Sequence, residues 1–131
     1  MKAFNCQDGY AIARILPKIG ITPVIITGRD SQITANRAKE LKITQLHQGV
    51  KDKLPLLQRI AEELGAEREE VAYIGDDLND MDCLRWCGLT GCPADAVPEV
   101  RAVVDFVAGR NGGRGAVREF VDTKVDRKSV V

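Results

Sequence analysis

Hydrophobic residues follow two alternating patterns along this chain, one typical of helices and one typical of strands. Apolar residues that recur every three or four positions predict amphipathic helices at residues 9–19, 31–41, 53–64, 78–86 and 115–125. Short continuous apolar runs predict strands at residues 24–27, 43–48, 71–74 and 102–107, with a further small strand and a turn within 88–100. Strands that alternate with helices form a parallel sheet with helices on both faces. The sequence therefore predicts an α/β protein with a Rossmann-like sheet.

The run from Val24 to Thr27 is continuously β-branched and is ended by Gly28. Runs of this kind belong to parallel strands that are buried on both faces. In open sheets of this type, ligands bind beyond the carboxyl ends of the strands. The residues that follow each predicted strand are therefore the first candidates for a functional site.

Three groups of polar residues lie at or near that edge of the predicted sheet. They are Thr27 and Arg29 after one strand, Lys53 at the start of a helix, and Asp76, Asp77 and Asp80 after another strand. Ionised carboxylates about 4 Å apart repel by about 4 kcal/mol at an effective dielectric constant of about 20, so the aspartates require a cation or a proton. A hydroxyl and backbone N–H groups after a glycine can hold phosphate oxygens, a lysine can neutralise them, and clustered carboxylates can carry Mg²⁺. The combination indicates a phosphate site with a metal ion.

Each of these residues also has an ordinary structural explanation. Thr27 could belong to a common turn after a strand, and Lys53 could be a solvated helix residue. Asp80 could only cap the short helix, and Asp77 could be a surface acid. Two consecutive aspartates directly after a buried strand are harder to explain in this way.

Composition narrows the classes of partner. The length of 131 residues suits one domain, which we expect to span residues 1–125, followed by a polar tail at 126–131. Basic and acidic residues number 19 each, so no net field favours nucleic acid or an anionic membrane. No apolar run approaches the ~20 residues that span a bilayer, and no signal peptide pattern precedes the first predicted helix. These features predict a cytoplasmic protein with a small-molecule partner.

The chain contains four cysteines: Cys6, Cys83, Cys87 and Cys92. They could suggest a metal site, but they lack the paired two-residue gaps of zinc modules. Cys83 and Cys87 lie four residues apart beside Leu84 and Trp86, as small buried residues on one helix face do. We expect the cysteines to be core thiols.

The order of the motifs carries a resemblance to a known family. The segments "IITGRD", "DKL" and "AYIGDDLND" resemble the second, third and fourth motifs of the haloacid dehalogenase superfamily of phosphatases. "KAFNCQDGYAIARIL", "PADAVPEVRAVVDFVA" and "NGGRGAVREFV" extend the resemblance over residues 2–122, to the 3-deoxy-D-manno-octulosonate 8-phosphate phosphatases and their acylneuraminate 9-phosphatase relatives. A receiver domain also places two acids at a strand end, but there the acid pair precedes the Thr and the Lys. The order in this sequence is the reverse.

This resemblance implies Mg²⁺-dependent hydrolysis of a phosphorylated eight- or nine-carbon sugar acid. Thr27 and Lys53 would act in catalysis, with Thr27 binding the transferring phosphoryl group and Lys53 screening its charge. Gly28 would support Thr27 through its N–H group, and Arg29 would meet the substrate. Arg114 could contact a sugar-acid carboxylate in a neighbouring subunit, or it could be a solvated residue at the glycine-rich start of a helix.

The resemblance also implies a metal site and an assembly. Asp76 and Asp77 would hold Mg²⁺ directly or through water. Asp80 would complete the metal-binding motif or orient it. Because relatives usually form tetramers, a homo-oligomer is expected, although a hairpin that helps to build those tetramers has no counterpart in this sequence.

The first motif of the family has no counterpart either. It is a strand that ends in Asp-x-Asp, where the first aspartate attacks phosphorus and the second acts as general acid and base. "NCQDG" supplies only Asp8, which resembles the "DG" at the start of the first helix, downstream of that motif. With the first strand and the nucleophile absent, the resemblance implies binding without turnover. The absent strand would lie between the strands at Val24 and Val71, which could close the gap, pair with another chain or keep unpaired edges.

Three explanations for this departure remain open. Met1 could be an internal methionine of a longer, active phosphatase. The chain could be a short binding or assembly module. It could also be a fragment of a bifunctional sugar-activating enzyme, because the same fold occurs as a non-catalytic C-terminal domain in some acylneuraminate cytidylyltransferases. The complete "IITGR" and "GDDLND" segments argue against long decay of the site.

Overall fold

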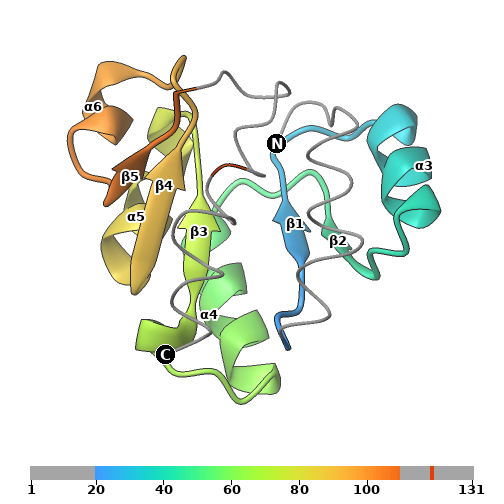
Figure 1. Ribbon diagram of the computed structural model, residues 1–131. Helices are drawn as coiled ribbons and strands as arrows, with labels where there is room; N and C mark the ends of the chain where they lie inside the picture. Colours follow the sequence, from blue (N-terminus) through green and yellow to red (C-terminus); the bar gives the residue numbers. More distant parts are fainter. Residues whose placement is uncertain (1–19, 110–118, 120–131) are drawn as a thin grey trace.

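The computed structural model describes residues 20–109 and residue 119 (Figure 1). Several expectations therefore lie outside the described residues: the helix at 9–19, nearly all of the helix at 115–125, the tail at 126–131, Cys6, Asp8 and Arg114.

The described residues form an α/β structure with short parallel strands. In chain order the strands are β1 (Val24–Ile26), β2 (Gln45–His47), β3 (Ala72–Ile74), β4 (Leu89–Cys92) and β5 (Phe106–Val107). The helices are α3 (Gln32–Glu40), α4 (Lys53–Glu63), α5 (Met81–Trp86) and α6 (Pro98–Arg101), and the 3-10 turns are η2 (Arg68–Glu70) and η3 (Leu78–Asp80). All strand pairs are parallel, which confirms the predicted fold class.

The structure differs from the prediction in several segments. The strand expected at 102–107 is confined to β5, because the N–H groups of Ala102 and Val103 still bond to carbonyls of α6. The helix expected at 78–86 is divided into η3 and α5, because Asp77 and Asp80 form a reciprocal capping box that tightens the first turn. The segment Pro98–Arg101, expected to lie in a turn, forms the helical turn α6. Pro98 lies in the first turn of α6, where backbone N–H groups have no partner within the helix. The N–H group that proline lacks therefore costs no helical hydrogen bond.

The strands form two separate sheets in the described part of the chain. One has the order β1-β2 and the other the order β3-β4-β5, with no pairing between β1 and β3 (Figure 1). The sequence left open whether β1 and β3 pair with each other in place of the absent first strand. Among the described residues this pairing does not occur.

Helix α4 packs against both sheets. Its residues Leu57 and Ile60 share a buried cluster with Ile26 of β1 and Cys83 of α5, and Tyr73 of β3 packs against the same cluster. Full burial of side chains of this size contributes about 1.5–3 kcal/mol each. The packing of α4 therefore holds the carboxyl end of β1 near the carboxyl end of β3.

The helix starts agree with their local sequence. Ser31 caps α3, because its side chain accepts a hydrogen bond of 3.4 Å from the N–H of Thr34. Helix α4 begins at Lys53, and Pro55 is tolerated in its first turn. This start places Lys53 at the same edge as the strand ends.

The cysteines in the described part of the chain are free thiols of the core. Cys83 and Cys92 are fully buried and Cys87 is half-buried. Burial raises the pKa of the Cys83 thiol to about 11 and that of Cys87 to about 12. Protonated thiols are poor metal ligands and nucleophiles, so the prediction of core thiols is confirmed for these three residues.

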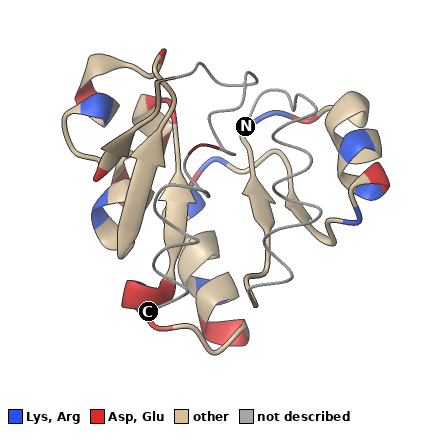
Figure 2. Ribbon diagram, in the orientation of Figure 1, with Lys and Arg blue, Asp and Glu red and all other residues tan. Residues whose placement is uncertain are grey.

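Charge is confined to helices, turns and loops. Figure 2 shows acidic and basic residues mixed over the helices, while β1 to β4 carry neither. Among the described residues, no helix has the length and apolar character needed to cross a membrane.

Candidate phosphate and metal site

The predicted site residues lie on three elements that meet at the carboxyl ends of the strands. Thr27 follows β1, Lys53 begins α4, and Asp76 and Asp77 follow β3. The start of α4 is in direct contact with the aspartate loop after β3, because Lys53 Nζ lies 2.8 Å from Asp80 Oδ1. This contact brings the start of α4 and the aspartate loop together at one edge.

Lys53 and Asp80 form a buried ion pair at the centre of the site. Their residues are 8% and 3% exposed. The same Asp80 oxygen, Oδ1, accepts a hydrogen bond of 2.6 Å from the Tyr73 hydroxyl. The other oxygen, Oδ2, accepts hydrogen bonds of 3.1 and 3.3 Å from the N–H groups of Asp76 and Asp77. Both oxygens of Asp80 are therefore engaged by groups of the protein.

These contacts determine the ionisation of Asp80 and Tyr73. Burial alone raises the pKa of Asp80, but hydrogen bonds from Lys53 and Tyr73 outweigh it and hold that pKa below its ordinary value. Burial, together with the charge of Asp80, raises the pKa of Tyr73 well above its ordinary range. Tyr73 therefore remains a neutral donor, and Asp80 remains a carboxylate.

The lowered pKa of Asp80 makes stability depend on pH in acid. A carboxyl group with a lower pKa in the folded chain stabilises the fold above its unfolded pKa of about 3.9, and this contribution is lost as pH falls through the folded pKa. We expect the free energy of unfolding, measured by urea denaturation without metal, to fall below about pH 4. A variant with Lys53→Met and Asp80→Leu should lose less stability over the same range. Equal losses in the two proteins would contradict this prediction.

Gly75 allows Asp80 to approach the end of β3. A Cβ atom at Gly75 would lie 2.7 Å from Asp80 Cβ and 2.8 Å from its Cγ. Contacts this short do not occur between real side chains, so only glycine fits without a shift of the backbone or of Asp80. The sequence indicated Gly75 only as the end of the strand, and this packing role was not predicted.

Asp76 and Asp77 differ in their surroundings. Asp77 is exposed, caps η3 and accepts a hydrogen bond of 2.7 Å from the N–H of Leu78. Asp76 is half-buried, and its carbonyl accepts a hydrogen bond of 3.2 Å from the N–H of Val97. No group of three or more His, Cys, Asp or Glu side chains in the described part of the chain is arranged to hold a metal ion. Asp80 is thus the buried member of the three aspartates and faces Lys53, whereas Asp76 and Asp77 are more accessible to solvent.

Backbone hydrogen bonds hold Thr27 at the end of β1. Its N–H donates to the carbonyl of His47, and its carbonyl accepts from the N–H of Val50, both at 3.0 Å. The buried hydroxyl oxygen accepts from the N–H of Arg29 at 3.1 Å. A hydroxyl that accepts a hydrogen bond still has its own proton to donate, so Thr27 can donate to an anion.

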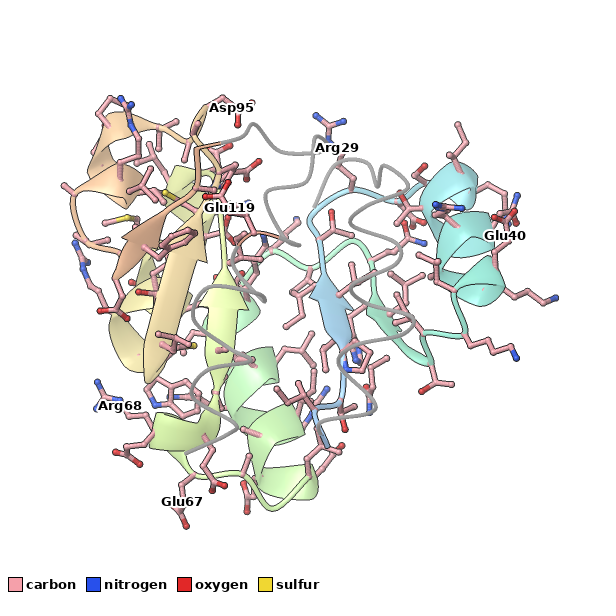
Figure 3. The ribbon with its side chains drawn as sticks, viewed as in Figure 1. Arg29, Glu40, Glu67, Arg68, Asp95 and Glu119 are labelled. Atoms are coloured by element: carbon pink, nitrogen blue, oxygen red, sulfur yellow. The ribbon has the colours of Figure 1, made fainter. Side chains whose placement is uncertain are left out.

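Arg29 and Glu119 lie at the edge of this region. Figure 3 shows the Arg29 side chain at the end of β1, pointing away from the strand, and its residue is exposed. Both oxygens of Glu119 accept from the N–H of Gly109, at 3.1 and 3.0 Å. Glu119 belongs to the glycine-rich C-terminal motif, and this contact places it next to the end of β5.

Sequence reasoning missed the part played by Tyr73. In the sequence it is one apolar member of a short strand, and nothing in its neighbourhood indicates that its hydroxyl is needed. The signal exists only in three dimensions, because Lys53 and Asp80 approach the strand from two other elements.

Comparison with known proteins assigns this chain to a family. A family model for haloacid dehalogenase-like hydrolases matches residues 30–120. The chain belongs to the haloacid dehalogenase-like hydrolases. This finding confirms the family that its second, third and fourth motifs indicated.

Two curated members of this hydrolase family show the group within it. The 3-deoxy-D-manno-octulosonate 8-phosphate phosphatase of Yersinia pestis is 44% identical over 122 residues, which cover 93% of this chain and 65% of the relative. The Escherichia coli K12 enzyme of the same name is 43% identical, with coverage of 93% and 64%. The chain thus spans slightly less than two thirds of the length of these relatives.

Solved structures of such hydrolases agree in fold. The Moraxella catarrhalis 3-deoxy-D-manno-octulosonate 8-phosphate phosphatase, in complex with magnesium ion, phosphate ion and KDO, is 40% identical with a TM-score of 0.89. The match covers 98% of this chain and 72% of that structure. A cobalt-bound octulosonate 8-phosphate phosphatase from Haemophilus influenzae is 33% identical with a TM-score of 0.89, covering 96% and 73%. The resemblance to this phosphatase group is confirmed.

Proposed function

We propose that this chain forms the phosphate- and Mg²⁺-binding part of a phosphatase acting on a phosphorylated sugar acid, with 3-deoxy-D-manno-octulosonate 8-phosphate as the first candidate substrate and acylneuraminate 9-phosphate as the second. The observation that carries the proposal is the Lys53–Asp80 pair. It joins the start of α4 to the aspartate loop in a chain of this family.

The phosphate end of the site is formed by Thr27, Gly28 and Lys53. The Thr27 hydroxyl and the Gly28 N–H would donate to phosphoryl oxygens. The Lys53 ammonium has three N–H donors, so its bond to Asp80 leaves donors for an anion. Arg29, exposed at the rim, would meet the sugar-acid part of the substrate.

The metal end of the site fits Mg²⁺ through its ligand chemistry. Mg²⁺ prefers hard oxygen ligands, keeps several waters and is usually bound by one or two carboxylates plus phosphate. Asp76 and Asp77 supply those carboxylates beside the proposed phosphate position. Asp80 was predicted as a third ligand or as an orienting group. We propose the orienting role, because both of its oxygens already accept hydrogen bonds from the protein. Bound Mg²⁺ would neutralise charge on the phosphoryl group.

Turnover requires a group that these residues do not supply. The family reaction uses an aspartate nucleophile from an Asp-x-Asp motif, and the 131-residue sequence contains no such motif at the expected place. Thr27, Lys53 and Mg²⁺ can bind and screen a phosphate ester, but phosphoester hydrolysis is among the slowest uncatalysed reactions. We therefore propose that these 131 residues by themselves bind the phosphate ester without hydrolysing it.

The other expectations stay predictions. The alternative of a non-catalytic assembly domain related to the acylneuraminate cytidylyltransferases gains no specific support from the site, which contains the residues of the second, third and fourth motifs. A tetramer, a contact of Arg114 with the substrate and a cytoplasmic location likewise await experiment.

Phosphate release with Mg²⁺ tests this proposal. We expect no release from 3-deoxy-D-manno-octulosonate 8-phosphate or acylneuraminate 9-phosphate by the unaltered chain. Calorimetry should show saturable Mg²⁺ binding that Asp76→Ala removes, because a carboxylate ligand is lost. Asp82→Ala, which removes an exposed carboxylate on α5, should bind Mg²⁺ like the unaltered chain.

Two results would contradict it. Turnover that Asp76→Ala abolishes would show that another carboxylate replaces the absent nucleophile. Failure of a folded chain to bind Mg²⁺ would remove the metal site.

A further inference from the structure

The segment that follows β2 is bonded to the loop that follows β1, which we call the β1 loop (residues 27–31). The N–H of Val50 donates to the carbonyl of Thr27 at 3.0 Å. The N–H of Gly49 donates to the carbonyl of Arg29 at the same distance. Gly49 has a φ of 66°, in the left-handed region that glycine adopts without strain, so the chain can turn directly after β2. The backbone of the β1 loop is thus bonded to its neighbour as far as Arg29.

Gln48 extends this support to the far end of the β1 loop. Its side-chain oxygen Oε1 accepts a hydrogen bond of 2.7 Å from the N–H of Ser31. Ser31 is the N-cap of α3, so its N–H group has no partner within that helix. Gln48 is half-buried, which partly shields the bond from water. This bond therefore fixes the point at which the β1 loop enters α3.

The two ends of the β1 loop are held in different ways. Thr27 is bonded through its backbone N–H and carbonyl to backbone groups of His47 and Val50, which remain whatever side chain stands at those positions. At the other end, the N–H of Ser31 depends on the Gln48 side chain. A substitution at Gln48 is therefore expected to loosen the α3 end of the loop and to leave the Thr27 end in place.

Arg29 lies between these ends and depends on both. Its side chain is exposed and points away from β1 (Figure 3), so the position of its guanidinium group follows the backbone that carries it. A sugar acid phosphorylated at its last carbon carries the phosphate and the carboxylate at opposite ends of its carbon chain. The distance between the phosphate position at Thr27 and the guanidinium group of Arg29 therefore decides which chain length fits.

We propose that Gln48 is a positioning residue for substrate specificity. By holding Ser31, it keeps Arg29 where its guanidinium group meets the carboxylate of the sugar acid while the phosphate is bound at Thr27. Gln48 acts through the β1 loop and does not itself contact the substrate. The inference rests on the proposed function, because it requires a phosphorylated sugar acid at this site.

The test compares two ligands by calorimetric titration of the full 131-residue chain with Mg²⁺ present. Inorganic phosphate reports on the Thr27 end alone, whereas 3-deoxy-D-manno-octulosonate 8-phosphate reports on both ends. Arg29→Met should weaken binding of the ester at least about tenfold, or about 1.4 kcal/mol, because a hydrogen bond to a charged group contributes at least that much. Gln48→Met, which removes the acceptor at nearly constant length, should lose most of the same factor. Its binding of inorganic phosphate should change by less than about twofold.

Two further variants separate positioning from general support of the fold. Gln48→Glu keeps an oxygen that can accept from the N–H of Ser31, so it should bind the ester more tightly than Gln48→Met does. A chain with both Gln48→Met and Arg29→Met should bind the ester no more weakly than Arg29→Met alone, because no guanidinium group is left to position.

Gln45 provides a matched control on β2. It is half-buried like Gln48, but its Oε1 is hydrogen-bonded to the ring of His47 in the same strand, at 2.9 Å. Gln45→Met should bind both ligands like the unaltered chain. Melting temperatures of all variants, measured alongside, identify any loss of binding that comes from unfolding.

The outcomes separate this inference from the function on which it rests. Equal loss of both ligands in Gln48→Met, or no loss of either, would overturn the role of Gln48. If Arg29→Met binds the ester like the unaltered chain, the inference is wrong and the phosphate site stands. If the unaltered, folded chain shows no saturable binding of inorganic phosphate, the proposed function is wrong as well. Selective loss of the ester in Gln48→Met, with no additional loss in the double variant, supports both.

Discussion

Replacing Asp80 with alanine is expected to lower the free energy of unfolding by about 3–5 kcal/mol, the range for removal of one partner of a buried ion pair. The substitution leaves the Lys53 ammonium buried without its carboxylate and takes the acceptor from the Tyr73 hydroxyl. It also releases two backbone N–H groups of the aspartate loop. Urea denaturation at neutral pH measures the change.

Two further variants make this prediction specific to the buried pair. Replacing both partners, with Lys53→Met and Asp80→Leu, removes the charges together and should restore much of the lost stability, because apolar side chains of similar volume often replace buried pairs without loss. Asp82→Ala removes an exposed aspartate and should change stability by no more than about 0.5 kcal/mol. A double variant as unstable as Asp80→Ala would show that the aspartate loop needs the carboxylate itself.

Gly75→Ala is expected to destabilise the fold by about 1–3 kcal/mol, as overpacking of a filled interior does. The added methyl group would overlap Asp80 at its Cβ and Cγ, and neither atom is the mobile end of the side chain. Asp80 or the end of β3 must therefore move. We also expect weaker binding of Mg²⁺ and phosphate, because the aspartate loop moves with Asp80.

Gly109→Ala is the matched control for this overlap. Among the residues that the structure describes, a Cβ atom there would meet nothing closer than 3.7 Å, which is ordinary van der Waals contact. Thermal unfolding of both variants should show a lower melting temperature for Gly75→Ala than for Gly109→Ala. Equal melting temperatures would mean that Asp80 can withdraw at no cost.

The sequence predicted the parallel α/β order and the edge at which the site lies. Its apolar runs located β1 and β3. Burial agrees with the prediction for most of β1, whereas β3 is exposed or half-buried along its length. The ends of the strands were less well predicted. Strand β2 covers Gln45–His47 rather than 43–48, because a strand extends only as far as its partner offers hydrogen bonds.

For the site, the sequence predicted that Lys53 and Asp80 lie near the same edge, but it did not predict that they form a buried ion pair. Asp76, Asp77 and Asp80 look alike in the sequence. The structure separates them, because Asp80 is buried and accepts hydrogen bonds from Lys53 and Tyr73, whereas Asp77 is exposed. That difference depends on the direction of a side chain after a capped turn and on packing between distant elements. The spacing of the aspartates in the sequence predicts neither of these two properties.

The division into two sheets has a mechanical consequence for any ligand that touches both loops. In the described residues, β1 and β3 share no backbone ladder, so their spacing is set by α4, through Leu57 and Ile60, and by loop contacts. Side-chain packing yields more easily than a hydrogen-bonded ladder. The loops that follow β1 and β3 can therefore change their spacing without breaking a backbone hydrogen bond between these two strands, and a ligand that contacted both loops would hold the sheets at one distance.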